Sequence, residues 1–166
     1  LFTFKSSKKN YRYRYIIEAE VFDIEFIAIK FYQKNHKLSK KKYQTLTNAN
    51  EVRNIVNSCL QVIPILLQIY PNHSFGAVGS RAISEDEKFE SEKKNQRFVI
   101  YRAIMLKKFK EDKRFAFVES EDNSAFAIIN LSKLVRIEDL EFYVVDKYNE
   151  ILDCMVEIYN EIHYPE

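Results

Sequence analysis

Paired strand-like runs near both ends of the chain constrain its fold more than any other feature. Residues 11–20 alternate tyrosines and apolar residues with polar ones, and a second such run continues to about residue 32. Residues 114–119 and 125–131 form another pair, joined by a short polar stretch. Alternation with period two is typical of strands, and a short connection makes two strands antiparallel. The pattern therefore excludes the regular strand–helix alternation of a doubly wound parallel sheet.

Three other segments repeat their apolar residues with the period of a helix. The first runs to about residue 70 and opens with Asn48 and Glu51, which match a capping box. Pro64 lies inside this segment and predicts a kink, because proline removes one hydrogen bond of the helix. The other two helices are expected at residues 95–109 and 137–162.

The order of these segments predicts the fold class. Residues 73–78 read as a strand, and residues 43–47 as a short optional one. The order ββ(β)αβαββα indicates an α+β fold, a mostly antiparallel sheet with three main helices, which we expect on one face. Near Ile27 the alternation changes parity, which predicts a β-bulge or burial of both faces. With 166 residues, the whole chain (1–166) fits a single domain.

Charge is segregated along the chain, although the net charge is only +2. Residues 1–44 contain 11 Lys/Arg against 4 Asp/Glu, and residues 93–114 contain 9 against 2, so each carries +7. Residues 137–166 contain 1 against 9, a net of −8. Such segregation indicates an anionic partner for one surface, but solvated faces and internal complementarity produce it too.

The two cysteines indicate the compartment. Cys59 and Cys154 both fall on apolar helix faces, where reduced thiols are typical core residues of a protein from a reducing compartment. The start of the chain has no hydrophobic signal region, and no apolar run is long enough for a membrane span. The expected location is the cytoplasm, with no membrane association.

Only two glycines occur, Gly76 and Gly79, within one hexapeptide. A chain so poor in glycine is expected to use it where positive φ or close approach is required. Gly79, Ser80 and Arg81 at a strand end would offer N–H groups, a hydroxyl and a guanidinium to a phosphate. Neither the P-loop nor the GxGxxG spacing is present. The structural alternative is a bulge or a close helix crossing at Gly76, with a turn at Gly79.

A second constellation opens the helix expected at 95–109. Basic residues there alternate with aromatic ones, a combination that grips a nucleic-acid backbone and stacks bases. The same pattern arises when the aromatic rings are core and the charges solvated. Tyrosines and arginines alternate similarly over residues 11–15. The candidate residues for an anion or nucleic acid are Gly79, Ser80, Arg81, Lys93, Lys94, Arg97, Tyr101 and Arg102.

No catalytic or metal signature is present in the sequence. The three histidines are scattered, without an i, i+4 partner or a nearby cysteine. Pairs of carboxylates such as Glu18 and Glu20 share a strand face and could hold a divalent ion, but solvated strand faces contain such pairs routinely. We therefore expect no cofactor, no metal and no catalytic residues.

Four short motifs carry a resemblance to a known family. They are Leu-Thr-Asn at 46–48, Asn-His-Ser-Phe-Gly at 72–76, Asn-Gln-Arg-Phe at 95–98 with Tyr101-Arg102, and Ser-Ala-Phe-Ala-Ile-Ile-Asn at 124–130. With these motifs, residues 43–130 resemble an uncharacterised family of short bacterial proteins, a domain of unknown function. The resemblance implies a shared fold and brings no activity, cofactor or catalytic residue.

Three functions are compatible with these features. The first is a non-enzymatic binding protein whose basic surface meets an anionic partner such as nucleic acid. The second is a protein–protein interaction module, of the oligomeric or toxin-neutralising type, that uses the acidic last helix. The third is an enzyme for a phosphorylated substrate around Gly79, Ser80 and Arg81, which would need a pocket and a carboxylate.

Overall fold

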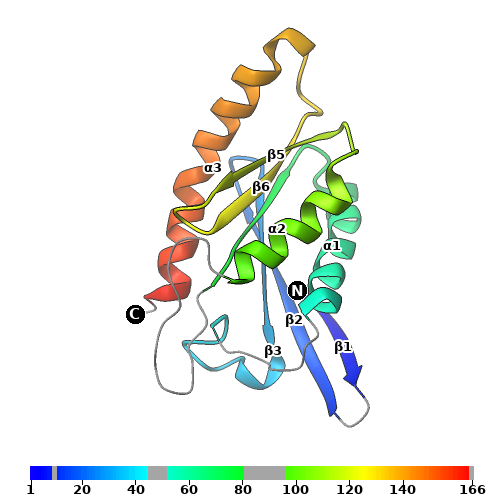
Figure 1. Cartoon of the computed structure of the whole chain (residues 1–166), viewed down its shortest axis with the longest axis vertical. Coiled ribbons are helices and arrows are strands. Elements are labelled where there is room, and N and C mark those ends of the chain that lie inside the picture. The colour runs from blue at the N-terminus through cyan, green and yellow to red at the C-terminus, as the bar shows by residue number, and fades with distance from the viewer. Residues whose placement is uncertain (9–10, 45–51, 81–95, 165–166) are drawn as a thin grey trace.

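A six-stranded sheet in the order β1-β2-β3-β4-β6-β5 forms the centre of the computed structural model (Figure 1). The structure describes residues 1–8, 11–44, 52–80 and 96–164. β3 and β4 run parallel, and the other neighbouring strands are antiparallel. The strands are β1 (Phe2–Lys8), β2 (Tyr11–Phe22), β3 (Phe26–Gln33), β4 (Ser74–Val78), β5 (Phe115–Ser120) and β6 (Ala125–Asn130). The helices are α1 (Val52–Ile69), α2 (Gln96–Phe109) and α3 (Leu140–His163), with short 3-10 turns at Lys34–His36 and Ile137–Asp139.

The α+β class and the order of elements are confirmed, but one strand lies elsewhere than expected. The additional N-terminal strand is β1, whereas Tyr43 and Gln44 lie in a turn and residues 45–47 fall outside the described part. β1 pairs with β2 over its whole length. The Phe4 ring stacks on Tyr15 with centroids 5.2 Å apart, so even this short run buries an aromatic face.

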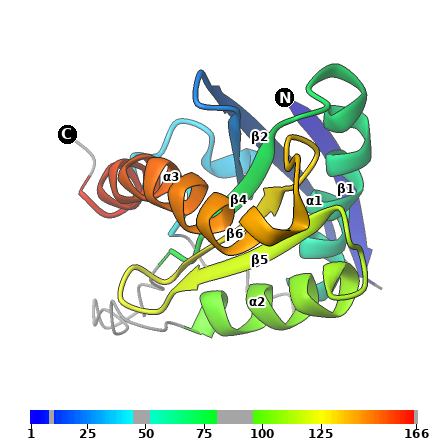
Figure 2. The same ribbon diagram turned by 90° about the horizontal axis from the view of Figure 1, so that it is seen from above.

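The helices cover both faces of the sheet, so the expectation of one covered face was wrong. α1 and α2 lie on one face and α3 on the other (Figure 2). The reason is that β2 and β3 are apolar on both parities: Ile17 and Ile27 face α1 and α2, while Ile16 and Phe26 face α3. β3 keeps a continuous register with β2, so the parity change near Ile27 reflects burial of both faces.

Gly76 is required by close packing. A Cβ on Gly76 would lie 2.8 Å from the Cε of Met155 and 2.8 Å from the ring of Phe26. This confirms the close helix approach at that position. Neither glycine adopts a positive φ; Glu25, in the turn between β2 and β3, and Ser124, in the turn between β5 and β6, do so instead.

α1 is a core helix that continues through Pro64. Seven of its residues are buried, including Cys59 and Ile63. Within the described residues it is the helix that meets the length and hydropathy of a membrane span, but core helices of soluble domains meet the same criteria. Its buried stripe against the sheet makes it such a core helix. The expected capping box, Asn48 and Glu51, lies outside the described residues.

Candidate ligand-binding cavity

The site begins where β3 and β4 separate. These parallel strands pair only through Phe26–Ser74, Ile27–Phe75 and Ala28–Gly76. Beyond these pairs, β3 stays on β2 and β4 stays on β6. Ligand sites of proteins with parallel strands lie in such a crevice, outside the carboxyl ends of the strands.

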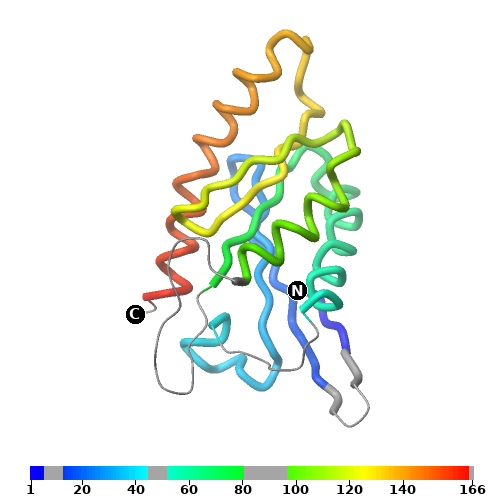
Figure 3. The backbone as a smooth tube through the Cα atoms, in the orientation of Figure 1, coloured from blue at the N-terminus to red at the C-terminus, as the bar shows by residue number. Residues whose placement is uncertain are grey.

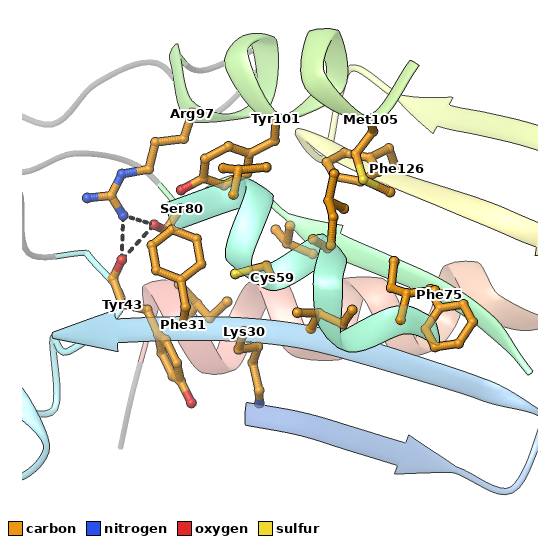
Figure 4. A pocket seen from close by; sticks show the side chains of 18 residues that line it. Lys30, Phe31, Tyr43, Cys59, Phe75, Ser80, Arg97, Tyr101, Met105 and Phe126 are labelled. Atoms are coloured by element: carbon orange, nitrogen blue, oxygen red, sulfur yellow. Dashed lines mark hydrogen bonds between the residues drawn. The ribbon is translucent and has the colours of Figure 1, made fainter. Parts of the chain in front are cut away.

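A cavity of about 60 Å³ occupies this position (Figure 4). β3 and β4 form its floor, and α1 and α2 form its cover. Most of its wall is apolar, contributed mainly by Val56, Cys59, Leu60, Ile63, Met105 and Phe126. At roughly 10–15 Å³ per water-sized group, the cavity accepts about four to six such groups.

One end of the cavity is polar and cationic. The Arg97 guanidinium donates hydrogen bonds to the Tyr43 carbonyl and the Ser80 hydroxyl (Figure 4). Its second terminal nitrogen donates to the Gln44 carbonyl at 3.2 Å. Ser80 Oγ in turn donates to the Tyr43 carbonyl at 2.7 Å. Three segments far apart in the sequence thus meet at one positive group.

The turn at Tyr43 and Gln44 is held against α3 as well. Gln44 Nε2 donates to the Ile162 carbonyl at 2.6 Å, near the end of that helix. Gly79, the residue before Ser80, donates its backbone N–H to the Ser124 carbonyl at 2.8 Å. These bonds connect the cationic end of the cavity to α3 and to the β5–β6 hairpin.

The Tyr101 phenol and the Cys59 thiol of the wall are neutral near pH 7. Burial raises the pKa of the Tyr101 phenol well above its ordinary value. Burial also raises the pKa of the Cys59 thiol to about 12, so Cys59 is a weak nucleophile. The described lining residues include no carboxylate and no imidazole. Arg97 and Lys30 supply the charge around the cavity, and Lys30 pairs with Glu20 and Glu161 on the α3 side of the sheet.

The structure brings together only some of the candidate residues. Gly79 leads into Ser80, and Ser80, Arg97 and Tyr101 line the cavity. Arg102 does not join them: its guanidinium pairs with the Glu119 carboxylate of β5 through two hydrogen bonds, one of them 2.9 Å long. The three other candidates, Arg81, Lys93 and Lys94, lie outside the described residues.

The aromatic residues of the expected nucleic-acid site are core residues. Tyr101 is buried, and its ring lies 5.8 Å from that of Phe31. In β2, Tyr15 is fully buried, while Arg14 is exposed opposite Lys5 of β1. The structural alternative for both segments, a buried aromatic face beneath solvated charges, describes these residues. Binding of nucleic acid stays a prediction.

Sequence reasoning missed Tyr43, Gln44 and the cavity itself. Tyr43 and Gln44 contribute backbone carbonyls, which no side-chain motif reveals. A signal did exist in α2, where Arg97, Tyr101 and Met105 follow one another at intervals of four. A charged residue at the start of an apolar stripe on one helix face indicates that the buried region beneath the helix has a polar end.

A second polar cluster lies on the α3 face. The Glu18 carboxylate accepts hydrogen bonds from the Tyr43 and Tyr32 hydroxyls and contacts Lys42 Nζ at 3.4 Å. Burial acts to raise the pKa of Glu18, but these hydrogen bonds and the Lys42 charge lower it overall. The paired carboxylates Glu18 and Glu20 therefore meet phenols and ammonium groups. Within the described part of the chain, no group of three His, Cys, Asp or Glu residues is arranged to hold a metal ion.

Comparison with protein-family models, curated proteins and solved structures finds no match. The resemblance over residues 43–130 stays a prediction.

Proposed function

We propose that this chain is a non-enzymatic binding protein for a small amphipathic anion. The observation that carries the proposal is an apolar cavity with one guanidinium, that of Arg97, at its end. A ligand complementary to such a site has a short apolar body and one anionic head. The proposal keeps the anionic partner that the charge segregation suggests and assigns it to a small molecule.

Size and charge set the ligand class. About four to six groups of water size correspond to a short alkyl or branched chain. An anionic head beside Arg97 would meet a charge-assisted donor at the end of a mostly apolar wall, and such bonds are about twice as strong as neutral ones. A carboxylate or a phosphate monoester provides that head.

Binding rather than catalysis is favoured by the groups around the cavity. A general acid–base step needs a group that changes its protonation near the working pH. Tyr101 and Cys59 stay protonated there, and the described wall offers no carboxylate or imidazole. The two free thiols, Cys59 and Cys154, support a reducing compartment, and we place the protein in the cytoplasm.

The test is a titration followed by two-dimensional amide NMR, with hexanoate, hexanol and hexylamine as probes of one chain length. Hexanoate should shift amides of α1, α2 and β4 with a Kd of about 10 µM to 1 mM, as expected for a ligand of this size. Hexanol should bind about tenfold more weakly and hexylamine more weakly still.

Two arginines of α2 provide matched variants. R97Q should reduce hexanoate binding to the level of hexanol, whereas R102Q, which alters only the outer pair with Glu119, should bind like the wild type. A thermal melt of each variant checks folding. Equal shifts for the three probes, or shifts away from the cavity, would contradict the proposal. Tight binding of single-stranded RNA or DNA that R102Q weakens and R97Q does not would favour nucleic acid instead.

A further inference from the structure

The outer face of α3 carries an exposed apolar stripe. Phe142, Val145 and Val156 are 75%, 50% and 37% exposed, although α3 buries its opposite side against the sheet. The N-terminal half of the helix extends beyond the strands (Figure 3). Apolar side chains that gather on one exposed surface, unlike scattered single ones, mark an interaction site.

The spacing of the stripe is that of a coiled-coil seam. Phe142, Val145, Asn149, Leu152 and Val156 follow one another at intervals of 3, 4, 3 and 4. This is the a/d pattern of a heptad repeat, which gives a straight seam for one further helix. Asn149 occupies an a position, where a single asparagine sets the register of a pair of helices.

The charges beside the stripe select the partner. Asp146 and Asp153 occupy the e positions, and Glu150 and Glu157 continue the same acidic side; all four residues are exposed. Lys147 donates to the Ile24 carbonyl and pairs with Glu150, so it adds little positive charge to this surface. A second copy of α3 would place carboxylates against carboxylates. A helix with lysine or arginine beside its seam would place opposite charges there.

We infer that the outer face of α3 is a docking surface for a helix of a partner protein, with apolar residues in heptad spacing and lysine or arginine beside them. This inference is independent of the cavity, because the stripe and the cavity lie on opposite sides of the sheet. It names a surface that the interaction module expected from the acidic last helix would use to bind its partner.

The test uses synthetic labelled helices and fluorescence anisotropy near physiological salt. One peptide has leucine at a and d with lysine at e and g, one has glutamate at e and g, and one is a scrambled lysine peptide. The full chain should bind the ordered lysine peptide at least about tenfold more tightly than the other two.

Variants locate the surface. V145D should weaken binding of the lysine peptide at least about tenfold. V99D, the same change at a 44% exposed valine of α2, should leave it unchanged. Reversal of the flanking charges in a D146K/D153K variant should favour the glutamate peptide, and circular dichroism verifies the fold of each variant.

Three outcomes would overturn the inference. One is equal binding of the scrambled peptide, and another is an equal effect of V145D and V99D. The third is a homodimer of the wild-type chain in sedimentation that V145D abolishes, because a second copy would then cover the stripe.

Discussion

The two faces of the sheet are built from the same strands, but they differ in the polarity of the side chains that they bury. Under α1 and α2, residues such as Ile17, Ile27 and Phe75 form an apolar layer, and Phe75 also lines the cavity. Under α3, the alternate residues of β2 and β3 include Glu18 and Lys30 as well as apolar side chains. Lys30 is only 8% exposed, and its charge is compensated by two carboxylates.

The number of helices that cover each face explains how polar its buried side chains are. Two helices cover the first face, so polar groups there would be costly unless hydrogen-bonded. A single helix covers the second face, and at its edge Lys30 pairs with the part-exposed carboxylates of Glu20 on β2 and Glu161 on α3. One face therefore has space for a ligand, and the other has paired charges. Four experiments test this contrast.

The largest effect is expected from truncating one isoleucine on each face. I151A removes a fully buried side chain under α3 and should lower the free energy of unfolding by about 3–5 kcal/mol. I63A should cost about 2–3 kcal/mol, because Ile63 already borders a void and has fewer contacts to lose. Urea unfolding measures both, with I65A, exposed on α1, as the control. A larger loss for I63A would mean that the cavity is filled in solution.

The next effect concerns the contact between β4 and α3. G76A would press a methyl group against Met155 and Phe26, and should cost about 1–3 kcal/mol in urea unfolding. The G76A/M155A double variant should lose less than the sum of the two single losses, because the shortened side chain makes room. Simple additivity would show that the clash is relieved elsewhere.

The two thiols should differ in reactivity. Cys59 lines the cavity and is buried, whereas Cys154 on α3 is half-buried. At pH 7.5 a maleimide should modify Cys154 at least about tenfold faster than Cys59, as measured by peptide mass spectrometry. In urea the two rates should become similar. Equal rates in the native protein would indicate frequent opening of the α1 and α2 face.

The smallest effect is a pH dependence from Glu18. The pKa of Glu18 is lowered in the folded protein, so its contribution to stability is present above about pH 4.5 and is lost as the pH falls through the folded pKa. E18Q should therefore be less stable than the wild type at pH 7, by about 1 kcal/mol or less for this partly exposed group. The difference should shrink towards pH 3 in thermal melts. E141Q, an exposed change on α3, serves as the control.

Much of the fold follows from patterns within single segments. The hairpin of β5 and β6, the stripe of α1 and the order of elements depend on local periodicity. The distribution of helices over two faces does not, because it depends on which strands become neighbours. Runs that are apolar on both parities, such as residues 26–29, indicate two covered faces, but the pattern within one strand does not say which helix covers each face.

The candidate site could be predicted only in part, for a physical reason. Ser80 and Arg97 stood out by residue type, but their common partner is the Tyr43 carbonyl, which every residue possesses. Arg102 had the same chemical character as Arg97, and only the position of Glu119 decides that it points elsewhere. The cavity lies where β3 and β4 stop pairing, and no single residue determines how many pairs two strands form.

The seam between β3 and β4, which consists of three residue pairs, also divides the sheet into two groups of strands, or units. On one side lies the meander of β1, β2 and β3, and on the other β4 with the hairpin of β5 and β6. The seam joins the two units through three residue pairs, fewer than any other two neighbouring strands of this sheet form. Local opening is easiest where few contacts hold two parts of a fold together. The seam is therefore the place where the native sheet would first come apart.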